Sequence, residues 1–196
     1  MIIVLTPEQQ VPNEQEVLRQ MFEAGLQRFH IRKYWWTDNE MKAYLDAIDP
    51  IFHQRLVLHS HYNLANDYGI NRLHFREEDR LANRHSPYKN EYEISTSVHE
   101  ITAFNDLDKI WRYAFLSPMF PSISKQGYGT DLAVLATLSQ RNNKHCQLIG
   151  LGGIDEGNFE VVIKQGADGI ALLGGIWQAP DPVAVYTSIQ SAYGKL

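Results

Sequence analysis

Ile149-Gly150-Leu151-Gly152-Gly153-Ile154 and Gly166-Ala167-Asp168-Gly169-Ile170-Ala171-Leu172-Leu173-Gly174-Gly175-Ile176 are the two segments that decide the fold of this chain. Each is a short apolar run that ends in paired glycines, and a helix-like stretch separates them. Paired glycines expose backbone N–H groups because no Cβ blocks the approach of a ligand. Two such strand ends side by side, each opening a helix, can hold a phosphate group. In a β/α barrel, the usual phosphate site is formed by the loops after strands seven and eight.

The length and charge of the chain narrow the classes of protein it can belong to. Its 196 residues suit one domain with a sizeable buried core. A net charge of −5 without any basic block argues against nucleic acid as a partner, because nucleic acids are bound by clustered Lys and Arg. No apolar run reaches membrane-spanning length, and the N-terminal Met1-Ile2-Ile3-Val4-Leu5 lacks the pattern of a signal peptide. We therefore expect a cytoplasmic protein with no membrane partner, in which the single cysteine, Cys146, is structural.

Short β-type runs alternate with helical patterns along the whole chain. We expect strands at Ile2–Leu5, Arg28–Arg32, Arg55–His59, Arg72–Phe75, Tyr92–Val98, Tyr113–Ser117, Gln147–Leu151 and Gly169–Leu173. Strands separated mostly by helix-sized segments indicate parallel α/β architecture. We predict a single (β/α)8 TIM barrel over residues 1–196. A doubly wound open sheet is the alternative, but the chain lacks a dinucleotide glycine fingerprint after the first strand.

Several connecting helices carry their own start and stop signals. Thr37-Asp38-Asn39-Glu40 matches a capping box ahead of an apolar stripe. Gly25 ends a stripe that begins at Val17. Asp131 can cap a later helix, and Pro182 can open the last one. These signals predict helices between the strands, as a barrel requires.

Polar side chains follow the expected strands at the end where a barrel carries its active site. They are His30, Arg32, His59, Ser60, His61, Asp79, Ser95, Ser97, His99 and Ser117, with Ser124 and Lys125 in the loop after the sixth strand. Arg32 and Lys125 are cations suited to phosphate oxygens, since arginine offers a planar fork and lysine a mobile point charge. The long loop that carries Lys125 can close over a ligand and bring this lysine inward.

Each of these candidates also has a structural explanation. Arg32 could be a surface residue with a buried stem, or half of an ion pair at the bottom of the barrel. His59 and His61 share a strand face and could bind a metal, but no third ligand has a convincing spacing, so we favour structural histidines. Asp79 lies in a charged run typical of a surface loop. The aromatic cluster Tyr34-Trp35-Trp36 could pack in the core or in a homo-oligomer interface, or stack on a heterocycle.

Together these residues resemble the thiamine phosphate synthase family, which includes the related thiazole tautomerases. The resemblance covers almost the whole chain. It is most specific at Leu116-Ser117-Pro118-Met119-Phe120-Pro121 with Ser124-Lys125 and Gly127-Tyr128-Gly129, and at Gly152-Gly153-Ile154 with Gly166-Ala167-Asp168-Gly169. The family fold is a β/α barrel, in agreement with the strand pattern. The resemblance implies a Mg²⁺-assisted reaction that couples two small-molecule substrates, an aminopyrimidine methyl diphosphate and a thiazole phosphate, to give thiamine phosphate and diphosphate.

The resemblance also implies roles for individual residues. Arg32, Lys125 and Ser97 would be catalytic, and Asp79 would be a magnesium ligand. The substrate-binding residues would be His30, Lys33, His59, His99, Ser117, Ser124, Gly153, Gly174 and Gly175. Such a site must neutralise a departing polyanion and keep a reactive cation from water.

The chain departs from the family pattern at two places. The synthases usually carry Gln-Leu-Arg-Glu-Lys on strand two, whereas this chain has His30-Ile31-Arg32-Lys33-Tyr34. The second cation is thus missing from its place, and the adjacent Lys33 could substitute for it. His59-Ser60 stands where the family has Asn-Asp after strand three, which leaves Asp79 to hold Mg²⁺ with the substrate phosphates.

These departures keep two alternatives to a synthase open. One is a thiazole tautomerase-like acid/base enzyme, in which His99 or His59 would move the proton. The other is a non-catalytic protein that binds thiamine phosphate or its thiazole phosphate precursor.

Overall fold

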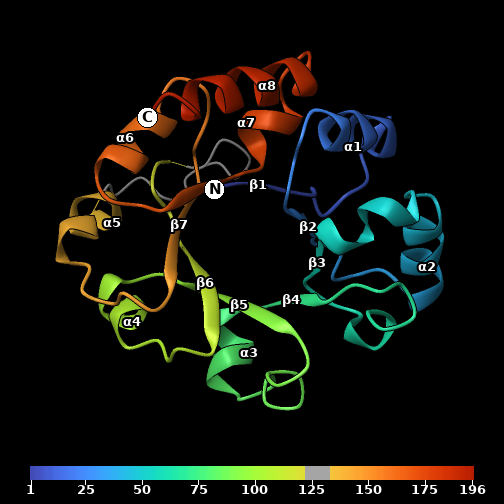
Figure 1. The fold of residues 1–196 in the computed structure, drawn as a ribbon, viewed down its shortest axis with the longest axis horizontal. Coiled ribbons are helices and arrows are strands. Elements are labelled where there is room, and N and C mark those ends of the chain that lie inside the picture. Colours follow the sequence, from blue (N-terminus) through green and yellow to red (C-terminus); the bar gives the residue numbers. More distant parts are fainter. Residues whose placement is uncertain (122–132) are drawn as a thin grey trace.

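The computed structural model describes residues 1–121 and 133–196. In this part of the chain, parallel strands form a closed barrel in which each strand pairs with the next along the chain and the last pairs with the first (Figure 1). They are β1 (Ile2–Leu5), β2 (Phe29–Ile31), β3 (Leu56–Leu58), β4 (Arg72–Phe75), β5 (Glu93–Val98), β6 (Trp111–Leu116), β7 (Gln147–Leu151) and β8 (Gly169–Leu172). The predicted (β/α)8 barrel is confirmed, and every strand boundary lies within two residues of its expected place.

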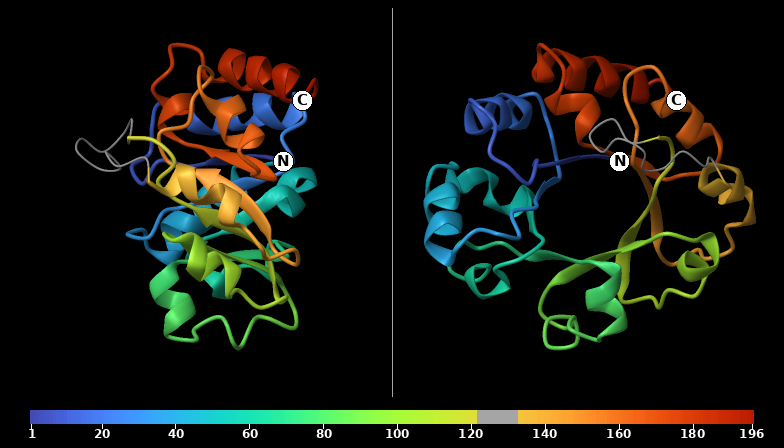
Figure 2. Two further views of the ribbon diagram at one scale, coloured as in Figure 1. Left: turned by 90° about the vertical axis from the view of Figure 1, so that its left-hand side faces the viewer. Right: turned by 180° about the vertical axis from the view of Figure 1, so that it is seen from behind.

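Helices surround the barrel and connect its strands (Figures 1 and 2). The α-helices are α1 (Glu14–Glu23), α2 (Asp38–Asp46), α3 (Glu77–Leu81), α4 (Ile101–Asn105), α5 (Ala133–Ala136), α6 (Phe159–Lys164), α7 (Gly174–Trp177) and α8 (Pro182–Tyr193). Short 3₁₀ helices add η1 (Pro50–Arg55), η2 (Tyr62–Leu64) and η3 (Thr137–Gln140). Among the described residues, no helix combines the length and the apolar character needed to cross a membrane.

Local signals in the sequence determine where these helices begin and end. Thr37 and Glu40 form the predicted capping box at α2, in which each residue accepts a hydrogen bond from the backbone N–H of the other. Gly25 follows α1 with φ of +100°, a conformation that favours glycine. Asp181 caps α8 directly before Pro182. The predicted cap at Asp131 lies outside the described residues.

The interior of the barrel has an apolar side and a polar side. Because alternate residues of a strand face opposite sides of the wall, one set packs against the helices and the other points inward. The inward residues of β1, β6, β7 and β8 form an apolar cluster of Ile3, Leu5, Tyr113, Phe115, Ile149 and Ala171. Two buried histidines from the other strands contact this cluster. His30 on β2 hydrogen bonds to Tyr113, and His74 on β4 stacks on Phe115.

Candidate active site

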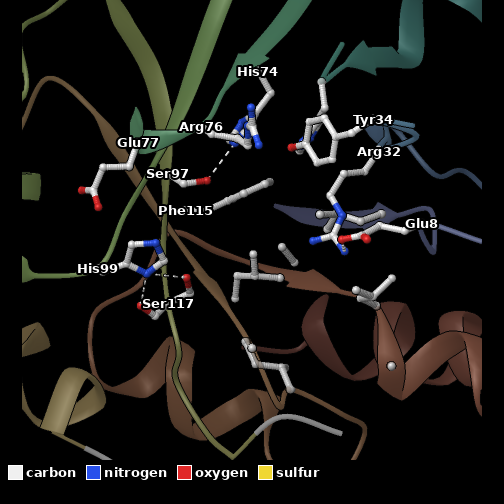
Figure 3. Close-up of a pocket in the computed structure, with 18 of the residues that line it drawn as sticks. Glu8, Arg32, Tyr34, His74, Arg76, Glu77, Ser97, His99, Phe115 and Ser117 are labelled. Carbon is white, nitrogen blue, oxygen red and sulfur yellow. Dashed lines mark hydrogen bonds and ion pairs between the residues drawn. The ribbon is translucent and has the colours of Figure 1, made fainter. Parts of the chain in front are cut away.

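A cavity of about 550 Å³ is lined by residues that lie at or just beyond the C-terminal ends of the strands (Figure 3). Many of the expected site residues meet in its lining: Arg32, His59, Ser97, His99, Ser117, Gly153 and Gly174. In Figure 3, Arg32 and Glu8 lie together on one side of the view, and His99 and Ser117 on the other. The predicted Ser124 and Lys125 lie outside the described residues.

The glycine pairs lie beside each other at this end of the barrel, because β7 and β8 are paired. Gly153 follows β7 with φ of +64°, and a Cβ there would collide with the backbone of Phe120. Gly174 begins α7 directly after β8. Gly153 and Gly174 both line the cavity, and without a Cβ their backbone N–H groups can be approached by a phosphate oxygen. Gly175 does not line the cavity, because it packs against the backbone of Asp155.

Arg32 brings one positive charge to the opposite part of the cavity. Its Nη2 lies 2.9 Å from Oε1 of Glu8, and its side chain is 20% exposed. The backbone N–H of Arg32 donates to the hydroxyl of Thr6 over 2.7 Å. The Glu8 pair uses one N–H group at Nη2, so other N–H groups of this planar guanidinium can bind a ligand.

Arg76 brings a second positive charge that the sequence analysis missed. It directly follows β4, lines the cavity and lies over the ring of Tyr34, with 4.6 Å between the guanidinium carbon and the ring centroid. Its Nη1 lies 2.6 Å from Oε1 of Glu78. Its position directly after a barrel strand was the signal that could have identified it. The charged run around residues 76–80 instead suggested a solvated loop.

Lys33 is not the replacement cation, which corrects the sequence analysis. Its Nζ lies 3.0 Å from Oε2 of Glu14, and both side chains are fully buried. Burial lowers the pKa of Lys33, while the charge of Glu14 opposes this effect. Tyr44 donates a hydrogen bond to the other oxygen of Glu14 over 2.7 Å. Lys33 thus joins β2 to α1 and α2 behind the wall of the cavity.

Asp79 is also absent from the described lining of the cavity. Its Oδ1 lies 2.7 Å from Nη1 of Arg84, and its Oδ2 lies 3.2 Å from Nε of Arg76. The carboxylate is therefore bound on both oxygens and is 6% exposed. Its two neighbours Glu77 and Glu78 line the cavity instead.

A buried chain of hydrogen bonds crosses the floor of the cavity. Tyr113 Oη lies 2.7 Å from Nε2 of His30, and Nδ1 of His30 lies 2.7 Å from Nε2 of His59. Nδ1 of His59 then lies 3.1 Å from Oη of Tyr34. His30 lies beneath the lining, whereas His59 and Tyr34 reach the cavity.

His74 packs beside this chain and was not among the expected site residues. Its ring stacks on that of His59, with 4.2 Å between the centroids. Its Nδ1 and Nε2 lie 2.9 Å from the hydroxyls of Ser95 and Ser97, respectively. Burial lowers the pKa of His74 to about 3 and holds the pKa values of His30 and His59 well below their usual range. All three rings are consequently neutral at pH 7.

His99 is the exposed histidine of the cavity. Its Nδ1–H donates to the backbone carbonyl of Ser117 over 2.9 Å, so Nε2 is the unprotonated atom of the neutral ring. An oriented imidazole with an unprotonated Nε2 can accept a proton from a bound ligand. His61 lies apart from His59: its Nε2 lies 2.8 Å from the carbonyl oxygen of Trp36. The pair of metal ligands considered on strand three is therefore not formed.

The three residues of the aromatic cluster after β2 lie in three different environments. Tyr34 reaches the cavity, and burial raises its pKa to about 12. Trp35 is 83% exposed at the cavity rim. Trp36 packs edge-on against Tyr44.

The fold and the site together define a β/α-barrel protein whose cavity suits a phosphorylated ligand. The chain belongs to the thiamine monophosphate synthase family, whose model matches residues 2–176. The resemblance seen in the sequence is thereby confirmed.

Individual relatives agree with this assignment. The thiamine-phosphate synthase of Staphylococcus haemolyticus is 25% identical over 189 residues, which cover 91% of this chain and 88% of that protein. The thiamine-phosphate synthase of Dictyoglomus thermophilum is 25% identical over 171 residues, covering 85% and 77%.

Solved structures show the same fold. The thiamine phosphate pyrophosphorylase of Bacteroides thetaiotaomicron superposes with a TM-score of 0.80 at 22% identity, over 98% of this chain and 97% of that one. The thiamine phosphate pyrophosphorylase of Pyrococcus furiosus gives a TM-score of 0.79 at 19% identity, over 99% and 95%.

Proposed function

We propose that this protein acts as a thiamine phosphate synthase, a transferase of thiamine biosynthesis. The C–O bond between the pyrimidine methylene and the diphosphate breaks, and its electron pair leaves with the diphosphate. The thiazole nitrogen then donates its lone pair to the methylene carbon, forming the C–N bond of thiamine phosphate. The observation that carries this proposal is a single cavity with glycine N–H groups on one part of its wall and Arg32 and Arg76 on another.

Two separate anion sites suit a reaction between two phosphorylated substrates. The N–H groups of Gly153 and Gly174 would bind the thiazole phosphate. Arg32 and Arg76 would bind the diphosphate and neutralise the charge that develops as it leaves. We place Ser97 beside the reacting pyrimidine, because its hydroxyl lies in the cavity and is oriented by His74. The catalytic role of Lys125 at the diphosphate and the substrate-binding role of Ser124 rest on the resemblance alone.

The cavity also contains carboxylates for Mg²⁺, the cofactor that the family implies. Mg²⁺ prefers oxygen ligands and uses one or two carboxylates together with substrate phosphates. Glu77 and Glu78 line the cavity, and each pairs with a guanidinium through its Oε1, of Arg80 and Arg76 respectively, whereas Asp79 is bound through both of its oxygens. Glu77 and Glu78 would thus hold Mg²⁺, which would assist the departure of the diphosphate.

His99 favours a second candidate function. Its unprotonated Nε2 suits acid/base chemistry, as the isomerisation of a thiazole carboxylate phosphate would require. That reaction needs a proton acceptor and no diphosphate site. It would therefore proceed without Mg²⁺.

One experiment separates these functions. The protein is incubated with both synthase precursors, with and without Mg²⁺, and thiamine phosphate is followed by mass spectrometry. We expect product that depends on Mg²⁺ and on both precursors. Metal-independent isomerisation of a thiazole carboxylate phosphate would instead identify the tautomerase. Binding of thiamine phosphate by calorimetry with no turnover of either kind would identify a non-catalytic binding protein.

A further inference from the structure

Three imidazoles from neighbouring strands meet beneath the floor of the cavity. His30 comes from β2, His59 directly follows β3, and His74 comes from β4. Their possible ligand atoms all lie within 4.8 Å of one another, and all three side chains are buried. We propose that these histidines form a binding site for one divalent transition-metal ion of the Zn²⁺ or Co²⁺ type. This site is separate from the carboxylates of Glu77 and Glu78, and its existence does not depend on the proposed function.

The distances from His30 to the other two rings match a shared ion. Imidazoles that bind one tetrahedral ion through metal–nitrogen bonds of about 2.0–2.1 Å have centroids about 5 Å apart. The observed centroid distances are 5.0 Å for His30–His59, 5.5 Å for His30–His74 and 4.2 Å for His59–His74. Nδ1 of His30 and Nε2 of His59 lie 2.7 Å apart and would separate to about 3.3 Å around such an ion. His59 and His74, which stack with 21° between their ring planes, would also tilt and separate so that both face the ion.

Each ring also has a partner on its outer nitrogen. Nε2 of His30 faces the hydroxyl of Tyr113, and Nδ1 of His59 faces the hydroxyl of Tyr34. Nδ1 of His74 faces Ser95, whose hydroxyl lies 3.3 Å from the backbone carbonyl of Leu73. Hydrogen bonds of this kind orient metal-ligating histidines and determine which nitrogen carries the proton.

The protons of the three rings can be assigned for the bound state. Ser95 donates to the Leu73 carbonyl, so it accepts from Nδ1–H of His74 and leaves Nε2 of that ring unprotonated. This Nε2 accepts a hydrogen bond from Ser97, which a bound ion would replace. In the metal-free protein, one proton lies between Nδ1 of His30 and Nε2 of His59. Metal binding requires the ring that carries this proton to move it to its outer nitrogen, beside a tyrosine hydroxyl. Each imidazole stays neutral, so no proton is released from the rings.

The donor set selects the class of ion. Neutral imidazoles suit Zn²⁺, Co²⁺, Ni²⁺ and Cu²⁺, whereas Mg²⁺ requires oxygen ligands. His59 and His74 line the cavity, which gives the ion a path to the site. The charged residues of the described lining are Glu8, Arg32, Arg76, Glu77 and Glu78. Three carboxylates against two guanidiniums make the formal charge there −1, which does not oppose the entry of a cation.

Cobalt titration of the whole protein tests the site. We expect one equivalent of Co²⁺ to bind, with the intense visible absorption of a four- or five-coordinate ion, and excess Mg²⁺ to leave the spectrum unchanged. His30→Gln and His74→Gln should each weaken binding at least tenfold. His61→Gln, a change at a nearby histidine outside the cluster, should keep the wild-type spectrum and affinity. Near-ultraviolet circular dichroism checks that each variant is folded.

Two further results keep the test decisive if a histidine variant does not fold. Tyr34→Phe removes an outer hydrogen-bond partner and should weaken Co²⁺ binding by about tenfold to a hundredfold. Wild-type protein that binds no equivalent of Co²⁺, or binds it with only weak octahedral absorption, would overturn the proposal. The proposal would also fail if the ligand variants and His61→Gln had equal affinity. None of these readouts depends on thiamine phosphate formation.

Discussion

Nδ1 of His30 lies 2.7 Å from Nε2 of His59, although the two residues are 29 positions apart in the sequence. Only one of these nitrogens can carry the proton of the bond, so the tautomers of the two rings are coupled. The coupled rings extend from Tyr113 in the barrel interior to Tyr34 at the cavity. A substitution at either tyrosine is therefore expected to change the tautomers of both histidines.

Because three histidines are buried, we expect the free energy of unfolding to fall in mild acid. Burial lowers the pKa of His74 to about 3, and the pKa values of His30 and His59 are lowered in the same direction. Unfolding restores a pKa of about 6.5, so the unfolded chain binds more protons below that pH. The free energy of unfolding is therefore highest, as far as these histidines are concerned, above about pH 6.5, and it decreases as the pH falls toward 3.

Urea unfolding between pH 7 and pH 5 measures this effect. Each histidine contributes a slope of up to about 1.4 kcal/mol per pH unit over most of this window. His74→Gln should make the dependence shallower. A free energy of unfolding that is equal at both pH values would contradict the prediction.

Arg76→Ala should impair thiamine phosphate formation. A charge-assisted hydrogen bond to a phosphate contributes about 1.5–3 kcal/mol, so we expect kcat/KM to fall about tenfold to a hundredfold. Arg84→Ala is the matched control, because Arg84 also pairs with Asp79 but does not line the described cavity. Steady-state kinetics with the pyrimidine diphosphate varied would test this, and equal losses in the two variants would count against a role in binding.

Gly153→Ala should reduce both stability and thiazole phosphate affinity. Gly153 and Gly69 have nearly equal φ angles, +64° and +63°, but only Gly153 has backbone atoms close to the position of a Cβ. Gly69→Ala measures the cost of the left-handed conformation, about 1–2 kcal/mol. Thermal unfolding should show a larger loss for Gly153→Ala, and calorimetry should show weaker ligand binding in that variant alone. Similar melting temperatures for the two variants would refute the steric argument.

Lys33→Met should destabilise the fold strongly. It leaves the carboxylate of Glu14 buried without its cation, which costs about 3–5 kcal/mol. Adding Glu14→Gln should recover part of this loss, because the uncompensated charge is removed. Denaturant unfolding of both single variants and the double variant gives the coupling energy. Additive losses would show that the two residues act independently.

The sequence by itself determined the barrel, because its evidence is local. Eight β-type runs, the capping box at Thr37 and the glycine after α1 each act over a few residues and fall where the structure has them. The paired glycines after β7 were recognisable for the same reason, since Gly152 and Gly153 both have positive φ angles.

Only the tertiary structure decided which polar side chains share the cavity. Lys33 and Arg32 are adjacent in sequence, yet one is paired with Glu14 behind the wall and the other lines the cavity. Arg76, which follows a different strand, is the second arginine of the described cavity lining, and the ring of His74 contacts that of His30 two strands away. These outcomes depend on strand register and on the direction of each side chain, which closure of the barrel imposes and spacing along the chain does not specify.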